Sequence, residues 1–237
     1  NNIKNKSKKF KYYRKSITDK IFLNKIIKKV DFVCHLAAIA NPAEYVSDPL
    51  KVIKLDALSA INIIDLSVKN KKKIIFTSTS EVYGKSSKMP FKEEDDRVIG
   101  STNINRWCYS TSKSLVEHYL FALKKTKNIE FICFRLFNVY GPRLTKRVMD
   151  VFINNFLNNK DIEILGSGKN KRTYMYIDDC MDAFYKSILN FNKMKNEVYN
   201  VGANFEMSTI ELAKRLKKEL NSKSKIYYTK DKFLKKT

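Results

Sequence analysis

The residues Tyr109 and Lys113 form a Tyr-x-x-x-Lys pattern that could carry acid–base chemistry. The segment that follows repeats apolar residues at helical spacing as far as Leu123, so we expect both residues on one helix. Side chains four residues apart on a helix project from the same face. An ammonium beside a phenol favours the phenolate and lowers the tyrosine pKa, so the pair could accept a proton from a sugar or alcohol hydroxyl. The pattern alone is short enough to recur by chance, and its context must decide.

Hydroxyl and carboxylate side chains follow a strand-like run upstream of this pair. The apolar run 73–76 is typical of a buried strand, and Thr79, Ser80 and Glu81 come shortly after it. A second run, at 129–136, predicts another strand that ends just before Asn138. Because ligands of open α/β sheets bind at the carboxyl ends of the strands, we expect these side chains to meet Tyr109 at one sheet edge.

Three segments in this order carry a family resemblance: 77–84, 105–113 and 137–143. They resemble the extended short-chain dehydrogenase/reductase family of nucleotide-sugar epimerases, dehydratases and decarboxylases. Within that family, the segments look most like UDP-glucuronate decarboxylases, including UDP-xylose synthases and the decarboxylase domain that serves lipid A modification. The resemblance runs from about Phe10 to about Leu220.

The resemblance implies an α/β fold with a Rossmann-like doubly wound parallel sheet whose N-terminal strands are missing. A smaller α/β C-terminal subdomain would bind the substrate. Residues 1–143 would form the partial NAD-binding domain, and residues 144–237 the partial nucleotide-sugar-binding subdomain. No glycine precedes Gly84, so the glycine-rich turn that holds a dinucleotide pyrophosphate is missing. We interpret the chain as a fragment; loss of the cofactor turn in an intact protein is the alternative.

The same resemblance implies catalytic roles with NAD as the cofactor. Tyr109 would take the proton of the sugar 4-hydroxyl, Lys113 would hold the phenolate and the nicotinamide ribose, and Thr79 would donate to the developing 4-oxygen. Ser80 and Glu81 would face carbon 5 and the carboxylate of a uronate. Plain 4-epimerases usually lack a carboxylate at this position, whereas 4,6-dehydratases and decarboxylases have one. A solvated turn glutamate is the alternative interpretation of Glu81.

Cofactor contacts are implied at Ala37 and Ala38, whose small side chains would admit NAD, and at Asp19, near its adenine. Asp19 could equally cap the helix that follows it. We favour a structural role for His35.

Substrate contacts are implied at Asn138, Arg147, Arg172 and Tyr174, with Arg106 as a further candidate for substrate or cofactor. A guanidinium presents a planar fork of donors that suits a diphosphate or a carboxylate. The resemblance places Arg172 at the diphosphate or the sugar carboxylate, and Arg147 near the uridine.

Composition limits the other function classes. The chain of 237 residues has 43% hydrophobic residues and a net charge of +23, with the lysines spread along it and no nucleic-acid-binding motif. We therefore expect no nucleic-acid partner, although the charge would attract anions such as a UDP-sugar. No apolar run approaches the roughly 20 residues of a membrane span, and we expect a cytoplasmic enzyme. The four widely spaced cysteines predict reduced thiols and no metal site.

We expect an NAD-dependent UDP-glucuronate decarboxylase, a lyase, that forms a homodimer. A 4-epimerase or a 4,6-dehydratase is the first alternative, and a truncated or non-catalytic nucleotide-sugar-binding fragment is the second. The remaining elements are predicted by periodicity and end signals. They are strands at 10–14, 30–38, 161–165 and 197–201, a loop at 41–49, and helices at 21–27, 50–69, 148–159, 177–191 and 208–220. The helix at 177 would be capped by Asp178 or Asp179, and the last helix by a capping box of Ser208 and Glu211.

Overall fold

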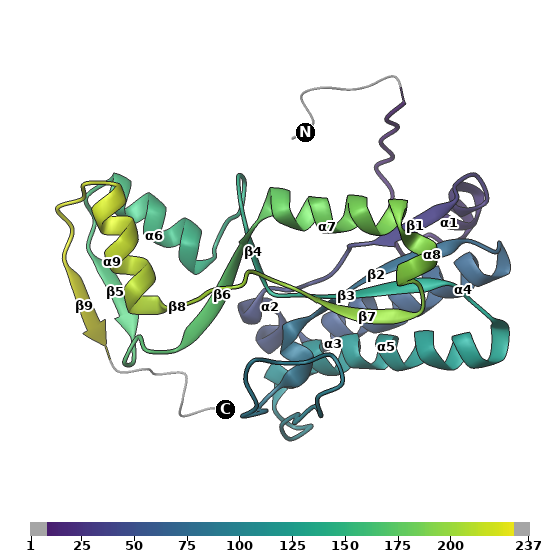
Figure 1. Ribbon diagram of the computed structural model, residues 1–237, viewed down its shortest axis with the longest axis horizontal. Helices are drawn as coiled ribbons and strands as arrows, with labels where there is room; N and C mark the ends of the chain where they lie inside the picture. Colours follow the sequence, from purple (N-terminus) through teal and green to yellow (C-terminus); the bar gives the residue numbers. More distant parts are fainter. Residues whose placement is uncertain (1–8, 230–237) are drawn as a thin grey trace.

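The computed structural model describes residues 9–229, and its main element is a four-stranded parallel sheet. The strands lie in the order β1 (Phe32–His35), β2 (Lys73–Thr79), β3 (Phe131–Leu136) and β7 (Glu197–Val201) (Figure 1). The central strands β2 and β3 are buried almost along their whole length, as expected for a parallel sheet covered on both faces. The predicted α/β architecture is confirmed.

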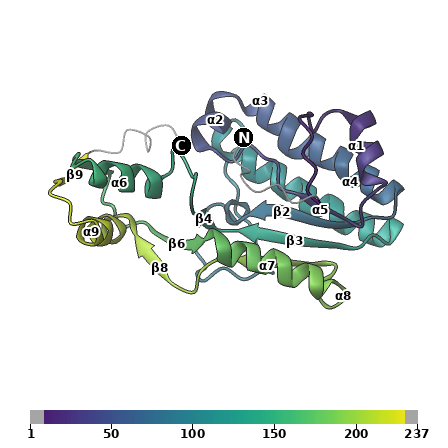
Figure 2. The same ribbon diagram turned by 90° about the horizontal axis from the view of Figure 1, so that it is seen from above.

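Helices cover both faces of this sheet. On one face, α4 (Ala60–Lys69) and α5 (Cys108–Lys127) pack on Ile74, Phe76 and Phe131. On the other face, α7 (Ile177–Leu189) and α8 (Phe191–Met194) pack on Ile75 and Ile132. Figure 2 shows α4 and α5 on one side of the sheet and α7 on the other. Adjacent residues of β2 and β3 serve opposite faces because successive side chains of a strand alternate in direction.

A second lobe lies beyond the end of this sheet. It contains α6 (Val148–Leu157), α9 (Thr209–Glu219) and a parallel pair of strands, β5 (Ile162–Leu165) and β9 (Ile226–Thr229) (Figure 1). Their apolar faces share one core around Phe152, Phe156 and Leu212. The predicted capping box at the start of α9 is confirmed, since Ser208 accepts from the Glu211 N–H and the Glu211 carboxylate accepts from the Ser208 N–H.

The chain passes between the lobes through strands that pair with each other. β4 (Asn138–Tyr140), β6 (Lys171–Tyr176) and β8 (Glu206–Ser208) form one sheet of order β4-β6-β8. β4 leads into the second lobe, β6 returns to the first, and β8 leads out again. The division at residue 143 stays a prediction. The chain after it builds the second lobe and also returns to add α7 and β7 to the first.

The segment 41–49, predicted as a loop, is helical. It forms α2 (Pro42–Ser47) and the start of α3 (Pro49–Val52). Asn41 and Asp48 accept hydrogen bonds from backbone N–H groups at each start, and a proline fills each first turn, where its missing N–H costs nothing. The predicted helix 50–69 is continuous, but Ile53–Ser59 within it has π-helical hydrogen bonding.

Two other local predictions are wrong. Residues 10–14 form no strand, because no other strand of residues 9–229 pairs with them and a strand needs a neighbour for its backbone groups. The N-cap of α7 is Tyr176 and has no side-chain bond; Asp178 and Asp179 lie inside the first turn. There their charge still favours the positive end of the helix dipole. Helix α1 (Lys20–Ile27) forms as expected.

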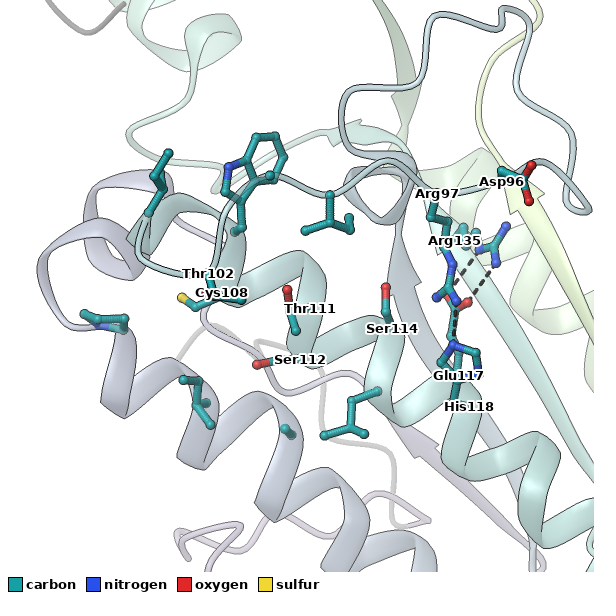
Figure 3. A pocket seen from close by; sticks show the side chains of 18 of the residues that line it. Asp96, Arg97, Thr102, Cys108, Thr111, Ser112, Ser114, Glu117, His118 and Arg135 are labelled. Carbon is teal, nitrogen blue, oxygen red and sulfur yellow. Dashed lines mark hydrogen bonds and ion pairs between the residues drawn. The ribbon is translucent and has the colours of Figure 1, made fainter. Parts of the chain in front are cut away.

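A buried ion pair joins α5 to the sheet. The Arg135 guanidinium donates to both carboxylate oxygens of Glu117, with Nε 3.1 Å from Oε1 and Nη2 2.8 Å from Oε2 (Figure 3). Ser78 on β2 donates to the same carboxylate. From its other side, Arg135 donates to the Tyr83 hydroxyl at 2.8 Å and to the Glu93 carbonyl at 2.9 Å. The pair therefore fixes β2, β3, α5 and the loop after β2 with respect to one another.

The substitution Glu117→Gln should strongly destabilise the fold. It leaves Arg135 charged, buried and without its counter-ion, a change that typically costs about 3–5 kcal/mol. Urea unfolding at neutral pH measures the loss. Glu206→Gln removes the exposed partner of Lys171 and is the matched control, for which we expect almost no change. Equal losses in the free energy of unfolding for the two substitutions would show that the buried pair stabilises the fold no more than the exposed one.

Candidate active site

A cleft of about 440 Å³ opens at the carboxyl ends of β2 and β3, where α5 begins and α6 approaches from the second lobe. It brings together most of the residues that the sequence singled out. These are Ala38, Thr79, Ser80, Glu81, Tyr109, Lys113, Asn138, Arg147 and Tyr174. Thr79 ends β2, and its hydroxyl accepts from the Glu81 N–H at 3.2 Å, which starts the tight turn Ser80–Tyr83. The first two turns of α5 supply Tyr109 and Lys113.

Tyr109 is nearly buried and hydrogen-bonds to the Thr79 side chain. Burial raises the pKa of the Tyr109 phenol above its ordinary value, and the bond to Thr79 opposes the shift only partly. The expected lowering of the Tyr109 pKa by Lys113 is wrong. The Lys113 ammonium donates instead to the Thr77 carbonyl at 2.8 Å. Tyr109 is therefore a neutral phenol at neutral pH.

Lys113 is almost completely buried, with its ammonium 4.8 Å from the centre of the Phe76 ring. Burial lowers the pKa of Lys113 to about 8, although the negative charges of Asp56 and Glu117 favour its charged form. A lysine that titrates near 8 is charged at neutral pH but close to releasing a proton. This property suits a group that works beside a phenol.

Asp56 and His35 are buried behind the cleft. One oxygen of Asp56 accepts from the Ile39 N–H at 2.8 Å, and the other has no partner among residues 9–229. Asp56 thereby fixes the backbone next to Ala38. Burial, together with Lys113, lowers the pKa of His35 to about 4, so its ring is neutral and stacks against Phe76. These contacts agree with a structural role for His35.

A polar cluster stands beside Tyr109. Arg106 lies 3.7 Å from the Glu81 carboxylate, and its Nη1 donates to the Tyr45 hydroxyl at 3.3 Å. The same hydroxyl lies 3.3 Å and 3.4 Å from the two oxygens of Glu81. Tyr45 was not predicted as part of the site, because residues 41–49 were interpreted as a loop. The Asn-Pro start at Asn41 was the signal that a helix presents this tyrosine.

Other predicted contacts lie outside the cleft lining. Asp19 caps α1, accepting from the Phe22 N–H at 3.0 Å, so the capping hypothesis is confirmed, and a contact with adenine stays a prediction. Ala37 does not line the cleft, although Ala38 does. Arg172 is exposed and donates to the Lys171 carbonyl. Its predicted contact with substrate likewise stays a prediction.

The residues within the cleft come from both lobes. Asn138 donates to the Thr173 carbonyl at 3.0 Å, and Arg147, at the start of α6, donates to the Ala40 carbonyl at 2.5 Å. Tyr174 on β6 is buried. A ligand in the cleft would therefore touch the sheet edge and the second lobe together.

Within residues 9–229, no group of three or more His, Cys, Asp and Glu side chains could hold a metal ion, and the four cysteines are free thiols. No helix in this part of the chain is long and apolar enough to cross a membrane.

Comparisons with known proteins agree with this geometry. The sequence model of the NAD dependent epimerase/dehydratase family matches residues 1–202. The bifunctional polymyxin resistance protein ArnA of Wigglesworthia glossinidia brevipalpis is 38% identical over 192 residues, which cover 76% of this chain and 29% of that protein. The chain therefore spans less than a third of this relative.

Solved structures are similar to this chain over most of its length. The PbgP3 protein from Burkholderia pseudomallei matches with a TM-score of 0.81 and 30% identity, over 92% of this chain and 72% of that one. The UDP-glucuronic acid 4-epimerase from Bacillus cereus, in complex with UDP-glucuronic acid and NAD, matches with a TM-score of 0.85 and 25% identity. That match covers 95% of this chain and 70% of the epimerase.

The burial of Lys113 predicts a dependence of stability on pH. Between about 8 and its ordinary value of 10.5, the unfolded chain holds a proton that the folded protein has released, so raising the pH through this window stabilises the fold. Below about 8, both states are protonated and the full cost of the buried charge remains. Urea unfolding of wild type and Lys113→Met at several pH values isolates this contribution. The wild type should gain stability over the variant as the pH rises, and a constant difference between them would contradict the shifted pKa.

Proposed function

The chain belongs to the NAD dependent epimerase/dehydratase family, and we propose that it converts UDP-glucuronate by oxidative decarboxylation through a 4-keto intermediate. The observation that carries the proposal is the Glu81 carboxylate in the cleft that holds Thr79 and Tyr109. The similarity to ArnA supports the same activity. A 4-epimerase would need no such carboxylate beside the oxidised carbon.

NAD is the cofactor of this family, and the cleft suits its nicotinamide half. The small side chains of Ala38 and Ala40 leave room at the cleft wall, which Tyr109 and Lys113 also line. When bound, NAD supplies the acceptor for the hydrogen of sugar carbon 4 and later its donor. A glycine-rich turn for the pyrophosphate does not occur within residues 9–229, since no glycine of the sequence precedes Gly84.

Oxidation at carbon 4 requires a proton acceptor at the 4-hydroxyl. Tyr109 would take this proton, and Thr79, already bonded to it, would donate to the 4-oxygen as that oxygen becomes a carbonyl. The Lys113 ammonium would stabilise the phenolate and contact the nicotinamide ribose once it leaves the Thr77 carbonyl.

The 4-ketone turns the uronate into a β-keto acid. The bond between carbon 5 and the carboxyl carbon breaks, carbon dioxide leaves, and the electron pair enters the enolate of the ketone. Glu81 and Ser80 would handle the proton that carbon 5 then receives. Glu81 is about one-third exposed, so a substrate can reach it.

Substrate binding would use both lobes. We assign Asn138 and Tyr174 to the sugar, Arg147 to the uridine, and Arg172 to the diphosphate or the carboxylate. Arg106 would contact the carboxylate next to Glu81. The cytoplasmic setting expected from the sequence stays a prediction, and so does the absence of a nucleic-acid partner.

We also propose a homodimer through a groove of about 1180 Å³ between α5 and the helical segment 49–59. Leu115 and Ile53, which line it, are 49% and 40% exposed. Figure 3 shows Arg97 and His118 together at one end, with Asp96 nearby. In a two-fold dimer each copy presents the same patch, so apolar residues would meet apolar residues and acidic groups could face basic ones.

The reaction is tested on the protein as its gene encodes it, with NAD and UDP-glucuronate labelled at the carboxyl carbon. We expect labelled carbon dioxide and a UDP-pentose or UDP-4-keto-pentose. Tyr109→Phe should slow the oxidation roughly 10²–10⁴-fold. Glu81→Gln should spare the oxidation and slow the protonation of carbon 5, and with it formation of the UDP-4-keto-pentose or UDP-pentose, whereas Glu44→Gln, an exposed control on α2, should change neither step. Formation of UDP-galacturonate with all label retained would establish a 4-epimerase instead. Binding without turnover would indicate a non-catalytic protein.

Sedimentation velocity tests the dimer. Leu115→Glu should place charge at the centre of the proposed interface and give a monomer. Leu157→Glu, at a leucine of α6 that is 61% exposed, is the matched control and should leave the mass unchanged. A wild type that sediments as a monomer, or a dimer that survives Leu115→Glu, would contradict this interface.

A further inference from the structure

We propose that Tyr45 is a positioning residue that holds Tyr109 through its ring and Glu81 through its hydroxyl. One side chain would thus position both Tyr109, which acts in the oxidation, and Glu81, which acts at carbon 5 after decarboxylation. The assignment of Tyr109 and Glu81 to these two steps rests on the proposed function. The contacts of Tyr45 with both residues are independent of it. Tyr45 does not itself line the cleft, so it would act through its two neighbours.

Tyr45 is firmly held. It lies on α2, is completely buried and packs with Val52 and Tyr109 in one apolar cluster. Its carbonyl accepts from the Cys108 thiol at 3.5 Å, and the carbonyl of the next residue, Val46, accepts from the Asn105 side chain at 3.0 Å. Helix α2 is therefore anchored to the segment that starts α5, and Tyr45 has little freedom to move.

The rings of Tyr45 and Tyr109 are stacked. Their centroids lie 5.4 Å apart and the planes differ by only 4°. Parallel offset rings at this separation attract each other beyond the effect of their burial. The stack limits rotation of the Tyr109 ring, and so keeps its hydroxyl directed at Thr79 and the cleft.

The hydroxyl of Tyr45 orients the carboxylate. It lies within hydrogen-bonding distance of both Glu81 oxygens, and Arg106 donates to it from the other side. Burial, with the nearby Glu81 charge, raises the pKa of Tyr45 to about 12, so the hydroxyl keeps its proton at neutral pH and donates. Ring and hydroxyl thus serve different neighbours, and substitution can separate them.

Two substitutions make that separation. Tyr45→Phe keeps the stack and removes the hydroxyl, so in a single turnover the appearance of NADH should be unchanged while formation of the UDP-4-keto-pentose or UDP-pentose slows about 10-fold, as for one lost hydrogen bond. Tyr45→Leu removes both contacts and should slow both steps. If Tyr45 had only a structural role, the rates of both steps would fall together in each variant, in proportion to the loss of folded protein. That result, or a Tyr45→Phe variant with both steps unchanged, would overturn the proposal.

A measurement without substrate keeps the proposal separate from the function. In protein labelled with ¹³C-tyrosine, the Tyr109 ring signal is assigned from Tyr109→Phe. Its ring-current-shifted position should persist in Tyr45→Phe and move in Tyr45→Leu. Tyr185→Leu, at an exposed tyrosine of α7, is the control and should move no signal but its own. An unmoved Tyr109 signal in Tyr45→Leu would overturn the stacking role, whereas a wild type inactive on UDP-glucuronate would overturn only the proposed function.

Discussion

The ion pair between Glu117 and Arg135 is the interaction on which the arrangement of the site depends. It is nearly inaccessible to water. Both carboxylate oxygens accept hydrogen bonds from the guanidinium, which also donates to groups on its other side. Glu117 lies one helical turn beyond Lys113, so the pair that locks α5 onto β3 also sets the depth of the lysine. Ser78 binds the same carboxylate from the strand that ends in Thr79. One buried charge pair thus aligns the strand that ends in Thr79 with the helix that carries Tyr109 and Lys113.

The sequence predicted those parts of the fold whose signal is local. The apolar runs of β2, β3 and β7 and the periodicity of α5 belong to elements buried against a large core, and all four formed where expected. The segment 10–14 has aromatic residues that favour a strand, but a strand exists only beside a partner, and its sequence cannot supply one. The strand β6 was missed for the related reason that it is defined by β4 and β8 on its two sides.

The positions of site residues could be predicted where a motif fixes the backbone. They could be predicted less well where a long side chain can place its end group in several directions. Thr79 and Tyr109 meet because a strand end and a helix start are rigid. Arg172 can reach many positions from its exposed place, and sequence gives no direction for its guanidinium. The predicted lowering of the Tyr109 pKa was wrong for another reason. A charge four residues away is visible in the sequence, whereas burial by surrounding residues is not.

The three strands that carry the chain between the lobes have a consequence for how this architecture can evolve. Since β4, β6 and β8 are hydrogen-bonded to each other, the lobes are joined by a small sheet rather than by a flexible tether. The chain has to be cut at each of these strands to exchange the second lobe for another. A single recombination point would separate β7 and α7 from the core they complete. New specificity is therefore more accessible through substitutions within the cleft than through shuffling of whole lobes.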